Sequence, residues 1–476
     1  MNINEENVED SKLSEYAYRN WYRYALETVE NRALPDMYDG LKPVGRRVLY
    51  AMLKMGVTDK AEAVKTKRVS GYTMGAYHPH GDSSIESVIT TLVNSSVPPI
   101  KGIGNWGDRE DGPASARYTN CKLSTYGMLL VNSDYMEVTP MSPNYDGKDS
   151  EPVVLPALVP NLFLNGAVGI AVGVTINMPP VKADGILAAC NKILAGEAVS
   201  AVTMAKTTSV EYPNGSKMVN TKENRMAWAE FWKTGSATIL IEPKAFEVNK
   251  ASHTVTIAGL PYDLGTISKI IDKVQDAFKE VRQVLNIGHG PLGEDCIEVQ
   301  CNKLAAPALE EFGKKVFDFL TVNIHPKLNC VQRKHLAVTD VEDIKVRIRA
   351  DSPLDILNSW CKLRVDLETR YLKRQREKIS VRQADIELLI YACANRKVIA
   401  QSWEAPDMKA FLLKKLTLTD EQAQTIMNLS NYRLSNLSLG KLEKQVVECR
   451  TQIKDLTNWL KTPEKKVVNF LTALTY

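Results

Sequence analysis

The first regular pattern of apolar residues lies in 12–31, where the spacing predicts a helix. Its apolar side is rich in aromatic residues and comprises Tyr16, Trp21, Tyr24, Ala25 and Val29. Two interpretations stay open: an ordinary amphipathic helix that packs on its own chain, or a helix that faces a partner.

The segment from Asp39 to Leu92 predicts three short helices. Pro43 suits the first turn of a helix, because its missing N–H costs nothing there. A helix-like run to Met74, the turn AYHPHGD (76–82) and a further helix then follow. The inward positions of that last helix are Ile85, Val88, Ile89 and Leu92. Helix, tight turn and amphipathic helix together are the outline of a helix-turn-helix.

Ser83 and Glu86 have the spacing of a capping box, which predicts that they close the first turn of this helix. Such a cap would be a complete structural reason for Ser83, and it competes with any binding role.

The middle of the chain, 181–340, alternates short strands and helices and predicts a separate α/β domain. Hairpin-like alternation occupies 236–261, an amphipathic helix 266–281 and a strand 294–303. No catalytic constellation is evident there, and four histidines are interpreted as structural: His253, His289, His325 and His335.

The last part, 341–476, is predicted to be helical. Apolar residues separated by three and four positions in turn form a coiled-coil seam that ends before Pro463. They are Leu439, Leu442, Val446, Cys449, Ile453, Leu456 and Leu460. Two long helices around a compact segment at about 392–437 predict an antiparallel arm with a globular tip, which serves either a dimer contact or a monomeric cap.

Composition narrows the class of protein. The chain has 476 residues, 44% hydrophobic residues and a mean hydropathy of −0.22. It lacks a run of roughly 18 apolar residues, so no membrane span is expected. The polar, acidic start is unlike a secretion signal. Eight scattered cysteines without a CxxC pair predict reduced thiols in a cytoplasm and no zinc site.

The net charge is only +4, so an interaction with nucleic acid must depend on local patches. Positive residues gather at 42–47, 65–68 and 117–122, with His78 and His80 between them. Because these clusters surround the predicted helix-turn-helix, they point to a phosphate backbone as partner.

The most informative stretch is Asn105–Leu123, NWGDREDGPASARYTNCKL. The loop Gly104–Ser115 is rich in turn residues, so Tyr118 is predicted on the strand or turn that follows. A tyrosine there has three interpretations: core filler, surface hydrogen-bonding residue or nucleophile. A phenol, with a pKa of about 10, is mostly protonated at neutral pH and needs a neighbouring cation or metal to act as a nucleophile. Arg117 is such a cation.

A second apolar stretch, GIAVGV at 169–174, predicts a strand or tight turn. An exposed apolar side chain in a DNA-binding domain can wedge between base pairs. The residues alone favour a core position for Ile170.

Four motifs carry a family resemblance: RALPDMYDGLKPVGRRVLYAM, YHPHGDSSI, GNWGDREDGPASARYT and NLFLNGAVGIAVGVTINMPP. In this order and spacing they resemble the DNA breakage–reunion subunit of type IIA topoisomerases, which is the A-type component of gyrase and topoisomerase IV. The short form is most similar to the medium subunit of the topoisomerase of T4-like bacteriophages.

The resemblance implies an α+β multidomain fold. Its parts would be an N-terminal helical arm (1–30), a winged-helix DNA-gate domain for cleavage (31–180), an α/β tower domain (181–340) and a long antiparallel coiled coil with a globular dimer-gate tip (341–476).

The resemblance also implies an ATP-dependent type II topoisomerase subunit in which Tyr118 forms a transient 5′-phosphotyrosyl bond in each strand of a gate duplex. The expected catalytic residues are Tyr118, Arg117 and Arg32. Ile170 would intercalate and bend the DNA, against the preference for a core position. The remaining expected DNA-binding residues are Lys42, Arg46, Arg47, Lys65, Lys67, Arg68, His78, His80 and Ser83.

This chain has no acidic cluster suited to Mg²⁺ and no ATP motif. The resemblance places Mg²⁺ and ATP mainly on a B-type partner subunit, so activity is expected only in a complex of two copies of each. The expected location is the cytoplasm, that of the host cell for a phage protein. The chain ends soon after the coiled coil, where gyrases continue into a DNA-wrapping domain, so relaxation and decatenation are expected.

Three rival hypotheses remain. A non-catalytic DNA-binding scaffold would keep the basic patches and heptads without needing Tyr118. A tyrosine recombinase also uses tyrosine on phosphate, but without a coiled coil or an ATPase partner. A self-supercoiling gyrase would need the wrapping domain.

Overall fold

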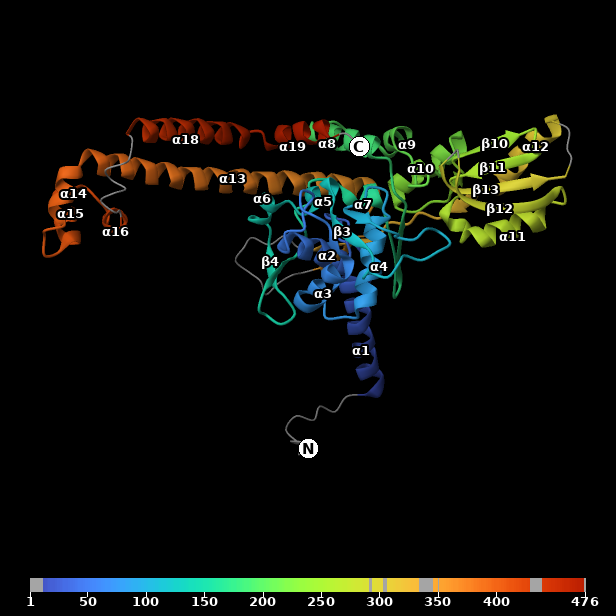
Figure 1. Cartoon of the computed structure of the whole chain (residues 1–476), viewed down its shortest axis with the longest axis horizontal. Coiled ribbons are helices and arrows are strands. Elements are labelled where there is room, and N and C mark those ends of the chain that lie inside the picture. The colour runs from blue at the N-terminus through green and yellow to red at the C-terminus, as the bar shows by residue number, and fades with distance from the viewer. Residues whose placement is uncertain are drawn as a thin grey trace. The chain divides into compact units, whose positions relative to one another are not determined.

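The computed structural model describes residues 12–290, 293–302, 306–333, 346–349, 351–428 and 439–474. The chain forms two compact units, which are considered separately (Figure 1). The first comprises Met1–Arg364 with Val468–Tyr476, and the second comprises Val365–Val467. No helix within the described ranges has the length and apolar character that crossing a membrane requires.

The first unit starts with a helix that continues into a short π-helical segment. These elements are α1 (Leu13–Thr28) and η2 (Val29–Ala33). The predicted helix is confirmed, but its aromatic side chains lie exposed, with Trp21 at 53% and Tyr24 at 63%. Val29, at the end of the predicted helix, is buried.

Three helices then pack around a small antiparallel sheet of order β1-β3-β2. The helices are α2 (Pro43–Lys54), α3 (Thr66–Ala76) and α4 (Asp82–Val93); the strands are β1 (Val64–Lys65), β2 (Ile100–Ile103) and β3 (Asn120–Leu123). Ile85 and Ile89 of α4 are completely buried, as their spacing predicts. The predicted helix pair is therefore confirmed.

The predicted capping box on α4 is wrong. Gly81 occupies the N-cap, and the helix has no side-chain cap bond. The carboxylate of Glu86 instead accepts hydrogen bonds from Lys67 Nζ (2.9 Å) and Ser70 Oγ (3.1 Å). A cation on the neighbouring helix competes with the local cap for this carboxylate, and the sequence around Ser83 holds no sign of that.

Several short elements follow β3, and the last two of them contain the apolar stretch at 169–174. They are α5 (Thr125–Leu130), α6 (Ser133–Met136), β4 (Met141–Pro143), β5 (Ser150–Pro152), α7 (Asn161–Asn165), β6 (Ala167–Ala171) and β7 (Val174–Met178). Strands β6 and β7 form an antiparallel hairpin. A Cβ atom on Gly169 would lie 2.2 Å from the carbonyl oxygen of Ala33, so only glycine permits this close approach.

Because side chains alternate along a strand, the neighbours of Gly169 face the other way. Ile170 is 81% exposed and Val168 is 66% exposed. The core position favoured for Ile170 is therefore wrong.

The rest of the first unit contains two larger α/β groups. The first has α8 (Ala183–Leu194), α9 (Ala201–Thr207), α10 (Lys222–Thr234) and a sheet of order β14-β9-β8, with β8 (Lys217–Met218), β9 (Ile239–Glu242) and β14 (Val322–Ile324). The strands β15 (Cys330–Arg333) and β16 (Val346–Arg349) pair with each other.

The second group, named here the β10–β13 body, is built on a four-stranded antiparallel sheet of order β10-β11-β13-β12. Its elements are β10 (Ala245–Asn249), β11 (Thr254–Ala258), η3 (Tyr262–Leu264), α11 (Ile267–Ala277), β12 (Val281–Gly290), β13 (Gly293–Cys301) and α12 (Ala306–Phe319). One apolar cluster joins both helices to the strands, including Ile270, Phe312 and Val299. The predicted hairpin, helix and strand of this region are confirmed, whereas His335 lies outside the described residues.

The second unit is helical. Its elements are α13 (Pro353–Ala394) from Val365 onward, α14 (Arg396–Ser402), α15 (Met408–Lys415), α16 (Asp420–Met427), α18 (Leu439–Trp459) and the start of α19 (Pro463–Ala473). Helices α13 and α18 pack side by side through a cluster containing Ile386, Cys393, Leu442, Val446 and Cys449 (Figure 1).

An ion pair of 2.9 Å between Arg450 and Glu387 joins the same two helices. A smaller cluster formed by Ile399, Leu412 and Ile426 fills the segment between them. The two long helices are thus confirmed, and the described part of the predicted tip has its own apolar cluster, whereas 429–438 lie outside the described residues. All eight cysteines of the chain are buried free thiols.

Val446 and Val447 allow a direct test of the coiled-coil seam, because the first is 6% exposed and the second 61%. Val446→Ala should lower the free energy of unfolding by about 2 kcal/mol, since it removes buried methyl groups and leaves a cavity. Val447→Ala should change it by less than about 0.5 kcal/mol. Denaturant unfolding followed by circular dichroism measures both, and equal losses would contradict the seam.

Candidate functional site

Tyr118 lies in the turn 116–118, immediately before β3. The start of α3 holds both sides of this turn through backbone hydrogen bonds. The amide of Lys67 donates to the carbonyl of Ala116 (3.2 Å), and the amide of Thr66 donates to that of Thr119 (3.1 Å). The predicted position of Tyr118 at the end of the loop is confirmed, and the backbone around it is fixed by a helix.

The side chain of Tyr118 is 68% exposed, which excludes the interpretation as core filler. The guanidinium carbon of Arg117 lies 5.4 Å from the centre of its ring. Arg117 Nε also donates to Ser115 Oγ at 3.3 Å. The turn therefore presents a phenol to solvent with a permanent cation beside it.

Three basic residues precede or begin α3, next to this turn. Lys65, Lys67 and Arg68 are all exposed. Lys67 forms ion pairs with Asp82 and Glu86 of α4, which links the two helices. The basic cluster and the tyrosine therefore belong to one surface, because the same helix start carries the cations and holds the turn.

His78 and His80 follow α3, and their rings stack with centres 4.3 Å apart. Burial lowers the pKa of His78 to about 4, with further contributions from His80 and from the cation of Arg47. The Nδ1 atom of His78 lies 3.1 Å from Nη1 of Arg47. Since a guanidinium only donates, Nδ1 is the acceptor, and the single proton of the neutral ring lies on Nε2.

Arg47 is held in place by a carboxylate that the sequence analysis missed. Its Nε and Nη2 atoms donate to the two oxygens of Glu151, both at 2.7 Å. This bidentate pair fixes the plane of the guanidinium and leaves Nη1 directed at His78. Glu151 lies in β5, 104 residues away along the chain, so no local sequence pattern indicates that it pairs with Arg47.

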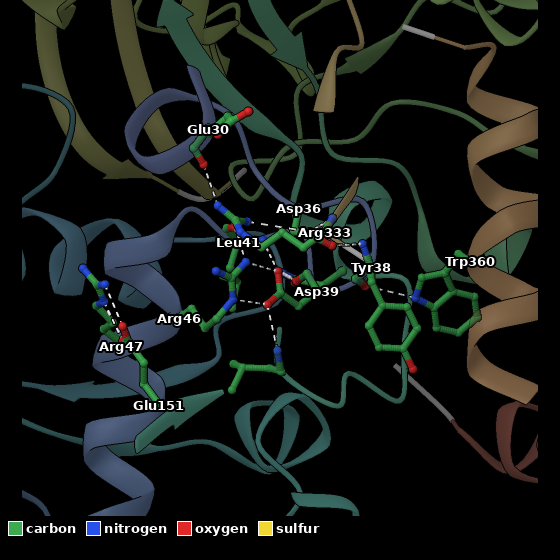
Figure 2. A network of polar contacts seen from close by, with 12 residues as sticks. Glu30, Asp36, Tyr38, Asp39, Leu41, Arg46, Arg47, Glu151, Arg333 and Trp360 are labelled. Atoms are coloured by element: carbon green, nitrogen blue, oxygen red, sulfur yellow. Dashed lines mark hydrogen bonds and ion pairs between the residues drawn. The ribbon is translucent and has the colours of Figure 1, made fainter. Parts of the chain in front are cut away.

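Arg46 differs from the expectation that it contacts DNA. It is buried, with 5% exposure, and forms a bidentate pair with the fully buried Asp39 (Figure 2). The distances are 2.6 Å from Nε to Oδ2 and 3.2 Å from Nη2 to Oδ1. A guanidinium enclosed in this way is not presented to a duplex, so Arg46 has a structural role.

The same buried network reaches the segment that carries Arg32. Asp36 accepts a hydrogen bond from the amide of Arg333 (3.0 Å), and Arg333 Nη2 donates to the carbonyl of Glu30 (Figure 2). Burial lowers the pKa of Arg333 to about 10. Arg32 itself is exposed on η2, and the backbone of this segment is held by the contact at Glu30.

The remaining predicted residues lie at element starts or ends. Lys42 precedes α2 and is half-buried, and burial lowers its pKa. Ser83 is exposed in the first turn of α4. Ile170 lies next to Gly169, which contacts Ala33 beside Arg32. The structure therefore brings Ile170 and Arg32 onto neighbouring segments.

Within the described ranges, no group of three or more His, Cys, Asp or Glu side chains could hold a metal ion. The described residues of this chain thus do not fit a complete Mg²⁺ site.

Comparison with known proteins connects this arrangement to a family. The family model that describes the A subunits of DNA gyrase and topoisomerase IV matches residues 32–474. The chain is 30% identical over 447 residues to the A subunit of DNA topoisomerase 4 from Caulobacter vibrioides, covering 92% of this chain and 57% of that protein. It is 28% identical over 480 residues to the DNA gyrase A subunit of Clostridium acetobutylicum, covering 97% and 55%. For the DNA gyrase A subunit of Fibrobacter succinogenes the identity is 29% over 481 residues, covering 95% and 50%.

The chain belongs to the family of DNA gyrase and topoisomerase IV A subunits, which confirms the resemblance seen in the four motifs. It spans about half the length of the curated relatives it matches.

The environment of His78 predicts a neutral imidazole throughout the physiological range. Because its pKa falls from 6.5 to about 4 on folding, the unfolded chain binds the proton more tightly. Its contribution to stability is therefore present above pH 6.5 and is lost as the pH falls towards 4. Histidine-selective ¹³C NMR, assigned with His78→Asn, should show a midpoint near 4, and a midpoint near 6.5 would contradict this environment.

The buried pair predicts a large effect of removing one partner. Asp39→Ala should cost about 3–5 kcal/mol of unfolding free energy, because it leaves the charge of Arg46 buried without compensation. Replacing both, as Asp39→Leu with Arg46→Met, should recover part of that loss. Denaturant melts provide the measurement, with the exposed Asp272→Ala as the matched control. A single variant as stable as this control would argue against the pair.

Proposed function

We propose that this chain is the DNA cleavage and religation subunit of an ATP-dependent type II DNA topoisomerase, with Tyr118 as the nucleophile. The observation that carries the proposal is the exposed Tyr118 on a turn held by α3, with Arg117 against its ring. Membership of the family of gyrase and topoisomerase IV A subunits supports it.

The reaction is a reversible transesterification. The phenol of Tyr118 loses its proton as its oxygen forms a bond to the phosphorus, and the 3′ oxygen of the neighbouring nucleotide leaves as a hydroxyl group after taking up a proton. The product is a 5′-phosphotyrosyl ester and a free 3′ end. Attack by that 3′ hydroxyl restores the phosphodiester and the phenol. One phosphoester replaces another, so resealing needs no ATP.

The surrounding cations have distinct tasks in this proposal. Arg117 stabilises the charge that develops on the phosphoryl oxygens. Lys65 and Arg68, exposed at the start of α3, bind the backbone on either side. Arg47 offers its remaining N–H groups and His78 its Nε2 proton, and the bidentate bond to Glu151 keeps them in one orientation.

Ile170 acts on the shape of the DNA. An 81% exposed isoleucine at a hairpin, seated against η2 by Gly169, suits insertion between base pairs. The resulting bend selects sites by deformability rather than by reading base edges. A second duplex then passes through the opened gate, which gives relaxation or decatenation.

The proposal assigns the helices α2–α4 with their sheet to a winged-helix DNA gate, and the β10–β13 body to a tower. The paired helices α13 and α18 with their tip form a homodimer contact. In this proposal Mg²⁺ and ATP are bound mainly by a B-type partner subunit, which is supported by membership of the family.

Covalent capture tests the nucleophile. The chain is mixed with its B-type subunit, Mg²⁺ and end-labelled DNA, and the reaction is stopped with detergent. Wild type should become attached to 5′ ends, whereas Tyr118→Phe should give no adduct. Tyr145→Phe is the matched control, because Tyr145 is another exposed tyrosine (52%).

Attachment to 3′ ends would move the chain to a different class of enzyme. DNA binding without any adduct in the wild type would favour a non-catalytic scaffold.

A further inference from the structure

The loop that precedes Tyr118 is fastened at its tip to a distant part of the first unit. All three nitrogens of the Arg109 guanidinium donate to backbone carbonyls more than 150 residues away. The acceptors are Gly265 (2.6 Å from Nε), Leu260 (2.7 Å from Nη1) and Pro261.

The environment of this guanidinium is enclosed. The side chain of Arg109 is only 6% exposed, and its Nη1 lies 3.8 Å from the carboxylate of Asp295. The centre of the Tyr262 ring lies 5.4 Å from its central carbon. The three carbonyl oxygens match the planar set of N–H donors of one guanidinium. A lysine, with a single ammonium group, cannot bond to all three in this geometry.

The next residue, Glu110, makes an independent attachment. The N-cap of α11, Thr266, makes no side-chain hydrogen bond to its helix. Instead, Glu110 Oε2 accepts from the amide of Ser268 at 3.0 Å, and Oε1 accepts from the Ser268 hydroxyl. A carboxylate from the loop thus supplies the cap that α11 lacks, at the end where the helix dipole favours negative charge.

Inside the loop, short hydrogen bonds make the tip rigid. Asp108 Oδ1 accepts from the amides of Glu110 (2.8 Å) and Asp111 (2.7 Å). The amide of Ala114 donates to the carbonyl of Asn105 at 3.1 Å, which closes the base of the loop. The tip and the base of the loop are therefore each held by hydrogen bonds within the loop.

The base leads directly to the reacting turn. The carbonyl of Ser115 accepts from the amide of Tyr118 at 2.8 Å, and the Ser115 hydroxyl accepts from Arg117 Nε. The β10–β13 body, with its own apolar core, is thus connected to Tyr118 through the hydrogen bonds of this loop.

Resting on the proposed function, we infer that Arg109 and Glu110 are positioning residues that attach the nucleophile loop to the β10–β13 body and so set the rate of DNA cleavage. They act through Ser115 on Arg117 and Tyr118. Neither residue touches the reacting atoms, so their loss slows bond formation without weakening DNA binding.

The experiment compares Arg109→Ala, Arg109→Lys and Glu110→Ala with Arg225→Ala. Arg225 is the matched control, because it also donates to two backbone carbonyls, those of Ala205 (2.8 Å) and Thr208 (3.0 Å), away from the loop. With the B-type subunit, Mg²⁺ and saturating DNA, the single-turnover rate of adduct formation should fall about tenfold in Arg109→Ala. DNA affinity should stay within about twofold of wild type, and Arg225→Ala should cleave at the wild-type rate.

Arg109→Lys should fall between Arg109→Ala and wild type, because an ammonium group reaches fewer of the three carbonyls. Glu110→Ala should lose less of the cleavage rate than Arg109→Ala. This variant also keeps the inference testable if Arg109→Ala folds poorly. Amide hydrogen exchange of the chain without its partner supplies a second readout: peptides covering 105–118 should exchange faster in the loop variants only.

Wild-type cleavage rates in both Arg109→Ala and Glu110→Ala, with adducts formed on Tyr118, would overturn the inference and leave the proposed function standing. An equal loss of cleavage rate in Arg225→Ala would mean that the effect reflects general stability, and this result would also overturn the inference. Absence of any wild-type adduct would overturn the proposed function first.

Discussion

The buried pair of Asp39 and Arg46 is the interaction on which the site depends. Two charges removed from water are costly unless each is fully paired and hydrogen-bonded. Asp39 meets that condition by also accepting the amide of Leu155 at 3.0 Å, and its own carbonyl accepts from the side-chain amide of Asn161. The start of α2, the segment before it and the chain between β5 and the start of α7 are thereby held together. Arg47 is the next residue of the same helix, and it lies on the side of α2 that faces the surface.

This contrast shows what the sequence can predict. Helical spacing, turn residues and alternating apolar positions are local signals, so α2–α4, the hairpins, the coiled-coil seam and the turn of Tyr118 could be predicted. Arg46 and Arg47 carry the same local signal, and only partners far along the chain decide which one is buried. Glu151 and the contacts of Arg109 are equally non-local, because they arise from how separate elements pack.

The wrong predictions have the same origin. Ser83 and Glu86 satisfy a local rule, but Lys67 on the neighbouring helix takes the carboxylate. Ile170 is apolar, yet the close approach of Gly169 to Ala33 decides which face of the strand turns inward. Family resemblance corrected the second case, because it carries information about the tertiary structure that composition and spacing lack.

The pairing of Arg47 with Glu151 and of Lys67 with Asp82 and Glu86 has a consequence for the ionic-strength dependence of binding. The free protein already supplies counter-anions for these two cations. At Lys67 a phosphate must replace a carboxylate, which then attracts its own cation from solution, whereas at Arg47 it meets a guanidinium that the retained Glu151 has already neutralised. The net release of ions on association is therefore smaller than the number of cationic side chains at the surface would suggest. Binding of phosphate at Arg47 and Lys67 should therefore depend more on the geometry of the backbone and less on the salt concentration.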